Sequence, residues 1–297
     1  MKCDLCPRKC LVDRKKGEKG ICGQTENLKV ARAALHFWEE PCISGDAGSG
    51  AVFFSGCPLH CVFCQNENIA NGTVGKEISV ERLAEIFLEL QEKGANNINL
   101  VTPGHFVPQI TKALDLAKQE GLKLPIVYNT SSYETVETIK RLEGYVDIYL
   151  PDFKYMSPVL SKKYSHAPDY AEVVKAAIAE MVRQTGKAVF VNGDEDNLIL
   201  SGTIVRHLTL PGCMADSMQI LKYLHDTYGD MIYISIMNQF TPLSNLEKYP
   251  ELNRRITDEE YETLVDYAIE IGIENGFIQE GDTAEESFIP AFDCEGV

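Results

Sequence analysis

Residues 51–66 read AVFFSGCPLHCVFCQN, an apolar run that leads directly into three closely spaced cysteines. The apolar part predicts a buried strand, and Cys57, Cys61 and Cys64 follow in the loop after it. Three thiolates at this spacing can each bind one iron of a [4Fe–4S] cluster, which leaves the fourth iron without a protein ligand. An open metal position indicates chemistry rather than a structural site. Zinc bound by the cysteines and His60 is the alternative, although His60 directly precedes Cys61, so shared chelation is awkward.

Downstream of the cysteines the chain alternates between strands and helices. A helix is expected over 79–93 because its apolar residues recur at helical spacing, with Ser79 as N-cap and Gly94 as stop. Further strands are expected at 98–101, 126–128, 146–150, 204–210 and 231–236, a hairpin at 189–200, and helices at 107–120, 133–142, 169–185, 214–228 and from Thr257. Strand–helix units with apolar strands predict an α/β fold with a parallel sheet covered by helices. A doubly wound sheet and a curved partial barrel both fit this pattern.

Polar residues recur just after the expected strands, where sites form in parallel α/β proteins. They lie in segments 102–105, 129–132, 152–154, 206–212 and 238–240. Asp152 and Lys154 are two residues apart and therefore share a strand face, so both can point into one cavity. A surface ion pair of small value is the plainer interpretation of these two residues. The Asn, Thr and Ser residues at 129–132 are also ordinary helix caps.

Residues 1–45 are rich in cysteine, and we expect them to form an extension to a domain of residues 46–297. Four thiolates suit a closed structural site that holds zinc or a second cluster, and a metal would help so small a segment to fold. Reduced thiols in a packed extension are the alternative. At the other end, the apolar residues of segment 288–293 are expected to dock onto the domain. The four candidate ligands in the extension are Cys3, Cys6, Cys10 and Cys22.

Composition excludes some classes of partner. The formal net charge of −16 argues against nucleic acid, because phosphate binding needs a positive surface field. No apolar run approaches the roughly 18 residues that span a bilayer, and the first residues lack the apolar stretch of a secretory signal. We therefore expect a cytoplasmic location and no membrane partner.

The spacing C-x3-C-x2-C after the first strand resembles the signature of the radical S-adenosylmethionine (SAM) superfamily. Phe63 with Gln65 and Asn66 is similar to the activating enzymes of glycyl-radical enzymes, in particular the pyruvate formate-lyase activating enzyme-like (PflX-like) branch. The resemblance covers nearly the whole chain and implies a partial (β/α)6 TIM-like barrel. It also implies that one-electron reduction of the cluster, by a donor such as flavodoxin or ferredoxin, cleaves SAM to a 5′-deoxyadenosyl radical, which takes a hydrogen atom from the substrate.

The same resemblance implies which residues contact the cofactors. Arg206 would suit the SAM carboxylate, because guanidinium binds carboxylates through two parallel hydrogen bonds. Gly104 would allow close approach of the backbone to SAM, whereas His105 stands where the superfamily usually has an acidic residue. The candidate SAM-binding residues are Phe63, Asn66, Gly104, His105, Asn129, Thr130, Asp152, Lys154, Arg206 and Gln239.

Three functions are compatible with these features. The first is a radical SAM enzyme that acts on a glycyl-radical protein, and the second is such an enzyme acting on a peptide or a small molecule. The third belongs to another class, an iron–sulfur electron carrier or redox sensor without SAM chemistry, with a zinc-stapled binding protein as a further variant. The motifs at the strand ends favour an enzyme, because neither non-enzymatic class needs a polar cavity of the size of SAM.

Overall fold

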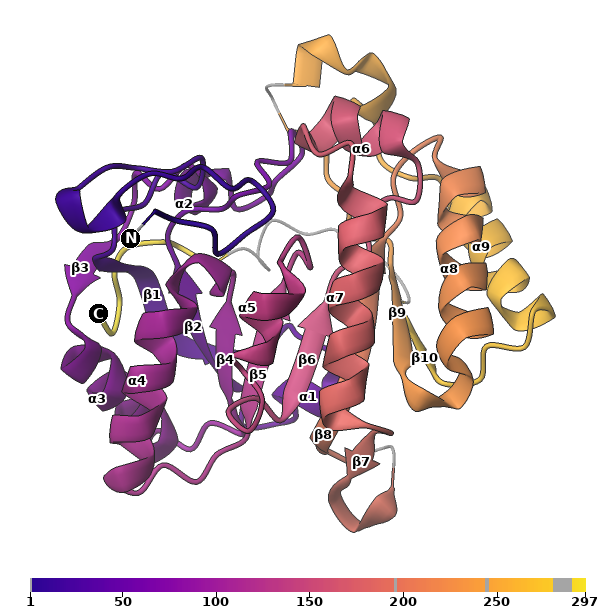
Figure 1. Ribbon diagram of the computed structural model, residues 1–297. Helices are drawn as coiled ribbons and strands as arrows, with labels where there is room; N and C mark the ends of the chain where they lie inside the picture. The colour runs from indigo at the N-terminus through magenta and orange to yellow at the C-terminus, as the bar shows by residue number, and fades with distance from the viewer. Residues whose placement is uncertain (1, 195–196, 244–245, 280–289) are drawn as a thin grey trace.

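The fold is built on one curved, mostly parallel sheet with helices packed along it (Figure 1). A computed structural model describes residues 2–194, 197–243, 246–279 and 290–297. The order of the strands is β10-β9-β8-β6-β5-β4-β2-β1-β3, and β7 pairs with β8. The parallel strands that were expected are β2 (Ser49–Phe54), β4 (Ile98–Val101), β5 (Ile126–Thr130), β6 (Ile148–Pro151), β8 (Ile199–Leu208) and β9 (Tyr233–Met237). The structure thus confirms the α/β fold of partial-barrel type.

The helices begin and end close to the predicted residues. Ser79 caps α3 (Val80–Glu92) by accepting a hydrogen bond from the backbone of Arg82, and a capping box of Thr257 and Glu260 begins α9 (Asp258–Glu270). α3, α4, α5 and α7 lie along one face of the sheet (Figure 1). The other predicted helices are α4 (Val107–Gln119), α5 (Val136–Lys140), α7 (Tyr170–Thr185) and α8 (Met214–Tyr228).

Alternation along the strands divides the core between the two faces of the sheet. Tyr128 and Tyr149 point to the helical face, where they join a core formed largely by α3 and α4. Their neighbours Val127 and Ile148 point to the inner face and pack with residues of α1 (Pro41–Ser44). Successive side chains of a strand face opposite ways, so β5 and β6 each contribute to both cores. The inner core fills the barrel below the carboxyl ends of its strands.

The amino-terminal region contributes a strand that the sequence analysis did not predict. β1 (Leu28–His36) pairs antiparallel with β2, and β3 (Lys76–Ile78) pairs antiparallel with β1. The expected boundary at residue 45 therefore does not coincide with the edge of the sheet, since part of the expected extension is a strand of it. Ahead of β1, the segment with the four cysteines contains a short 3-10 helix, η1 (Arg14–Lys16).

Other differences from the prediction are local. The hairpin exists as β7 (Val189–Phe190) against β8, but the two strands expected at 198–200 and 204–210 are one continuous β8. Besides β1 and β3, the helices and strands that were not predicted include α6 (Pro158–Ser165), β10 (Gly276–Ile278) and the short helices α1 and α2 (Glu67–Ala70). Across the four described ranges, no helix is both long and apolar enough to cross a membrane.

The carboxyl-terminal residues 290–297 return to β1. Cys294 donates a backbone hydrogen bond to Ala31, Ala33 donates one to Glu295, and the ring of Phe292 lies 5.4 Å from that of Phe53. The expected docking of the tail is confirmed for these residues, whereas Phe288 and Ile289 lie outside the described residues.

Candidate active site

The loop after β2 carries the three cysteines of the C-x3-C-x2-C motif. Gly56 and His60 have φ of +90° and +51°, so the chain turns sharply on both sides of Cys57. The turn directs His60 away from the cysteines, and its Nε2 lies 2.7 Å from the carbonyl oxygen of Ile21. His60 is therefore not placed as a ligand beside the three thiols.

Hydrogen-bond donors reach two of the sulfur atoms of this loop. The backbone N–H of Leu59 donates to Cys57 Sγ at 3.4 Å, and the hydroxyl of Ser165 donates to Cys61 Sγ at 3.1 Å. Burial raises the pKa of Cys57 to about 11, and burial also raises the pKa of Cys61 and Cys64. Metal binding removes the proton from such thiols and uses the same donors to stabilise the thiolates.

The cysteine loop rests on the amino-terminal segment. A side chain at Gly56 would collide with the carbonyl oxygen of Cys22 and would lie 2.6 Å from the Cγ atom of Gln24. Gly94, at the end of α3, has a similar φ of +84°, but open space surrounds it. Alanine variants of these two glycines therefore distinguish the effect of backbone strain, present in both, from the effect of a steric clash, present only at Gly56.

We expect Gly94→Ala to lower the free energy of unfolding by about 1–2 kcal/mol, the cost of a left-handed conformation for a residue with a Cβ atom. Gly56→Ala should lose roughly a further 1–3 kcal/mol because it also overfills a packed contact. Denaturant unfolding of both variants measures the difference. Equal losses would show that the amino-terminal segment does not lie against the cysteine loop.

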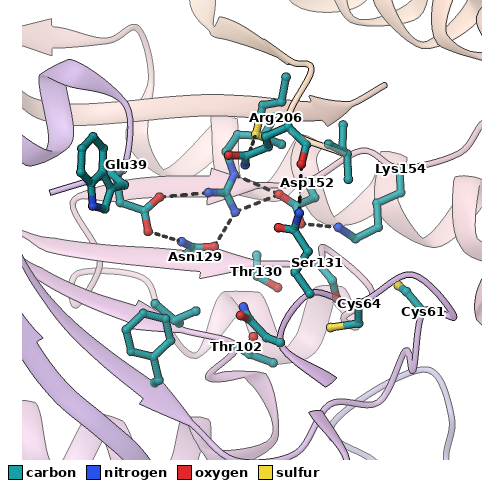
Figure 2. A pocket seen from close by; sticks show the side chains of 18 of the residues that line it. Glu39, Cys61, Cys64, Thr102, Asn129, Thr130, Ser131, Asp152, Lys154 and Arg206 are labelled. Atoms are coloured by element: carbon teal, nitrogen blue, oxygen red, sulfur yellow. Dashed lines mark hydrogen bonds and ion pairs between the residues drawn. The ribbon is translucent and has the colours of Figure 1, made fainter. Parts of the chain in front are cut away.

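A chain of buried ion pairs crosses the carboxyl ends of the strands (Figure 2). Asp152, directly after β6, accepts hydrogen bonds from Lys154 Nζ at 2.6 Å and from Arg206 Nε at 3.0 Å. Arg206 on β8 also donates to Glu39 Oε2 at 3.0 Å and to Asn129 Oδ1 at 2.6 Å. The chain thus runs from Glu39 through Arg206 and Asp152 to Lys154. Its Lys154 end lies nearest to Cys61 and Cys64 (Figure 2).

The charges in this chain stabilise one another. Burial alone would raise the pKa of Asp152, but Lys154 and Arg206 outweigh it and hold that pKa below its usual value. Burial would likewise lower the pKa of Lys154, yet Asp152 and Cys61 raise it above its usual value. Asp152 is therefore ionised and Lys154 protonated near neutral pH. The side chains of this pair are only 14% and 16% exposed, so it is not the surface ion pair that was the plainer interpretation.

The cysteines and the ion-pair chain line a single cavity of about 550 Å³. Thr130 lines the cavity from the end of β5. Phe63 closes one side, and its ring centroid lies 5.9 Å from that of Phe240 and 6.3 Å from that of Tyr155. Gln65 donates to the carbonyl oxygen of Gln239 at 2.9 Å and links the cysteine loop to the end of β9. The predicted site residues along the wall are Cys57, Cys61, Cys64, Phe63, Asn66, Asn129, Thr130, Asp152, Lys154, Arg206 and Gln239.

Two predicted site residues lie elsewhere. Gly104 faces the carboxyl group of Glu134, 2.8 Å from where its Cβ atom would stand, so close packing on Glu134 accounts for the glycine. The ring of His105 is buried and its Nε2 lies 2.7 Å from the carbonyl oxygen of Ser55. Burial lowers the pKa of His105 to about 3, so the ring is neutral. At this strand end Thr102, with a φ of +57°, lines the cavity instead.

The expectation for Arg206 also changes in detail. Its guanidinium is already engaged with Glu39, Asn129 and Asp152, and binding a further carboxylate would require one of them to move. Lys154 has more capacity, because an ammonium group has three donors and Asp152 is its hydrogen-bond acceptor among the described residues. Lys154 is thus the better placed cation for an anionic ligand.

Sequence reasoning missed the two acidic residues ahead of α1. Glu39 accepts hydrogen bonds from Asn99 and Asn129 at 3.0 and 3.1 Å in addition to its ion pair with Arg206. Glu40 lines the same cavity, and burial raises the pKa of its carboxyl group. The adjacent carboxylates before Pro41 were the only available signal, and nothing in that pattern indicates a partner 167 positions away in the chain.

The amino-terminal cysteines lie near one another. Burial, followed by the neighbouring thiols of Cys22, Cys10 and Cys3, raises the pKa of Cys6 to about 12. Within the described ranges, however, no group of three or more His, Cys, Asp or Glu side chains could hold a single metal ion. A metal at Cys3, Cys6, Cys10 and Cys22, whether zinc or a second cluster, stays a prediction.

The three cysteines of the cavity fit a cluster better than a single ion. They too form no group that could hold one ion, but each thiolate of a [4Fe–4S] site binds a different iron. All three line one cavity, with hydrogen-bond donors to the sulfur atoms of Cys57 and Cys61 and the Lys154 ammonium nearby. The donor set consequently matches the cluster that the spacing predicts.

Comparisons with known proteins agree with this fold. An uncharacterised protein of Methanocaldococcus jannaschii is 27% identical over 276 residues, which cover 90% of this chain and 74% of that protein. The fold resembles Streptococcus suis SuiB bound to its precursor peptide SuiA, with a TM-score of 0.50 and 10% identity over 75% of this chain. It also resembles HydG, a maturase of the [FeFe]-hydrogenase, with a TM-score of 0.51 and 14% identity over 76% of this chain.

The chain spans 46% and 50% of the length of those two solved structures. Residues 51–197, from β2 to the hairpin of β7 and β8, match the family model described as the radical SAM superfamily. This segment contains Cys57, Cys61, Cys64, Asp152 and Lys154. The cysteine spacing and the site geometry agree with this match, which places residues 51–197 in the radical SAM superfamily.

Proposed function

We propose that the chain is a radical SAM enzyme whose cavity holds a [4Fe–4S] cluster on Cys57, Cys61 and Cys64 with SAM beside it. The superfamily implies both cofactors. A volume of about 550 Å³ lies within the range of roughly 300–1,000 Å³ that is usual for small-molecule sites. When bound, the reduced cluster supplies the electron that cleaves SAM to a 5′-deoxyadenosyl radical.

The residues of the chain bind and orient. Lys154, held by Asp152, offers its ammonium to the carboxylate of SAM close to the cysteines. Asp152 in turn is fixed by Arg206, whose two terminal nitrogens donate to Glu39 and to Asn129. A charged group held by partners on several strands loses little freedom on binding, and this orients the reacting atoms. Phe63 and Phe240 exclude water from one side of the cavity.

One observation carries this proposal: three metal-binding thiols and a buried chain of opposite charges line the same cavity. An electron carrier or redox sensor needs only the thiols. Burying four charged side chains costs free energy. Binding of a zwitterionic cofactor in the cavity explains why these charges lie there despite that cost. The buried chain of Glu39, Arg206, Asp152 and Lys154 therefore favours the enzyme.

The surroundings of the cavity favour a polypeptide as substrate. A second hollow of about 810 Å³ shares wall residues with it, and the indole of Trp38 stands 60% exposed between the two. An extended segment lying in the second hollow can reach the cavity, whereas a small metabolite needs only one of them. The wall residues common to both are Trp38, Glu39, Pro41, Gln239 and Gln279.

A glycyl-radical protein is the leading candidate for this polypeptide, with a peptide second and a small molecule third. Its support is the resemblance of Phe63, Gln65 and Asn66 to the activating enzymes. An electron donor such as flavodoxin or ferredoxin would reduce the cluster.

Incubation of the reduced enzyme and SAM with glycyl-radical proteins of the same cell is expected to give a stable glycyl doublet in the EPR spectrum, matched by 5′-deoxyadenosine. The doublet requires hydrogen abstraction from a backbone glycine, so it reports the substrate directly. Turnover of a peptide or metabolite without a protein radical in any pairing would contradict the glycyl-radical substrate and leave the SAM chemistry intact.

A further inference from the structure

Arg8, between the second and third cysteines of the amino-terminal segment, contacts the loop that carries the cluster ligands. Its guanidinium donates to the carbonyl oxygens of Pro58 at 2.8 Å and Leu59 at 3.4 Å, both between Cys57 and Cys61. It also donates to those of Ser165 at 2.9 Å and His166 at 2.5 Å. One side chain thus joins two segments that lie more than a hundred positions apart in the chain.

The second segment is the end of α6. His166 has a φ of +51° and ends that helix in a left-handed turn. The last carbonyl groups of a helix lack partners within it and carry partial negative charge, so a cation there is favourable. The guanidinium also lies over the ring of Tyr133, with Cζ 5.1 Å from the ring centroid. These contacts fix Arg8 in one orientation.

What Arg8 holds together is a hydrogen bond to a cluster ligand. Ser165 donates to Cys61 Sγ at 3.1 Å, and its Oγ lies 2.8 Å from the hydroxyl of Tyr155. Because Ser165 gives its proton to the sulfur, Tyr155 is the donor to Ser165. Ser165 is fully buried, and its carbonyl oxygen is one of the four acceptors of Arg8.

We propose that Arg8 is a positioning residue for the cluster, acting through the Ser165–Cys61 hydrogen bond to set the reduction potential. The inference rests on the proposed function, because it requires a cluster on Cys57, Cys61 and Cys64. A hydrogen bond to a ligand sulfur stabilises the more negative, reduced cluster and so raises its reduction potential. Without the fork of Arg8, the loop and the end of α6 are free to separate and this hydrogen bond lengthens.

The test uses three variants, namely Arg8→Lys, Ser165→Ala and the double variant that combines these two changes. Lys19→Ala is the control. Arg8→Lys keeps the positive charge but loses the planar guanidinium that donates several hydrogen bonds at once. Lys19 is a suitable control because it is an exposed cation of the same segment. Each full-length protein is reconstituted anaerobically, its iron content is matched to wild type, and the midpoint potential is measured by EPR-monitored redox titration.

Both single variants should titrate at a more negative potential than wild type, and Lys19→Ala should not. The double variant should shift no further than Ser165→Ala alone, because the two residues act on one hydrogen bond. A wild-type potential in either single variant, or additive shifts, would overturn the role of Arg8. A wild-type protein that holds no reducible cluster would overturn the proposed function itself.

Discussion

Replacing Cys57, Cys61 or Cys64 by Ala, one at a time, is expected to abolish reductive cleavage of SAM. The three thiols line one cavity, and a cluster with an open fourth iron has only three protein ligands. A variant with two of these three ligands should not hold the cluster. 5′-Deoxyadenosine formation should therefore fall by more than about 1,000-fold, the scale on which removal of an essential catalytic group acts. Quantifying 5′-deoxyadenosine with dithionite as reductant measures the loss.

Cys213→Ala is the matched control for the three variants. Cys213 is the N-cap of α8, and its side chain is partly buried against the neighbouring core. This variant should keep both the cluster and the wild-type rate. If Cys57→Ala, Cys61→Ala or Cys64→Ala still cleaved SAM at that rate, the cluster would have to lie elsewhere.

Asp152→Asn is expected to leave the cluster content unchanged while lowering the rate of SAM cleavage by about 100-fold, the scale of a misplaced reacting group. The variant keeps the shape of the side chain but removes the charge that holds Lys154 and Arg206. Lys154 then no longer has a fixed direction, and two buried cations face each other without the carboxylate. Iron analysis and SAM titration, alongside the cleavage rate, separate binding from reaction.

Asp226→Asn provides the comparison at an exposed ion pair. Asp226 binds Lys222 at 2.9 Å with its side chain 55% exposed, and such pairs contribute roughly 0–1 kcal/mol. This variant should match wild type in every assay. Equal behaviour of Asp152→Asn and Asp226→Asn would place Asp152 outside the reaction.

Much of the fold follows from local patterns. The helical spacing of α3 and the capping box of α9 fixed their first residues, because caps and apolar periodicity act within a few positions. The site residues Asp152, Asn129 and Arg206 were predictable for a related reason. Parallel strands end at one edge, so polar residues after them converge whatever their separation in the chain.

The features that were missed depend on distant partners. β1 contains Ala31, Ala33 and Ala34, residues without strand preference, and pairing with β2 and β3 makes it a strand. β10 has three residues and exists through its pairing with β9. α6, by contrast, had a local signal, since Ser157 caps it and Pro158 follows at the first position.

The same reasoning explains the errors within the site. Glu39 reaches Arg206 only because β1 and α1 bring it to the open edge of the sheet. His105 was placed at the cavity because it follows β4, but the short 3-10 helix Gly104–Phe106 turns its ring toward Ser55. The position of a residue in the sequence predicts that it lies near the carboxyl end of a strand, but it does not predict the direction in which its side chain points.

The most direct test of the central claim is the EPR spectrum of the anaerobically reconstituted, reduced protein, recorded with and without SAM. Binding of SAM at the open iron of a cluster on Cys57, Cys61 and Cys64 changes the environment of that cluster. We therefore predict a reduced [4Fe–4S] signal whose g values shift when SAM is added, together with 5′-deoxyadenosine in the same sample. A cluster signal that SAM leaves unchanged, with no 5′-deoxyadenosine formed, would contradict the account and favour an electron carrier.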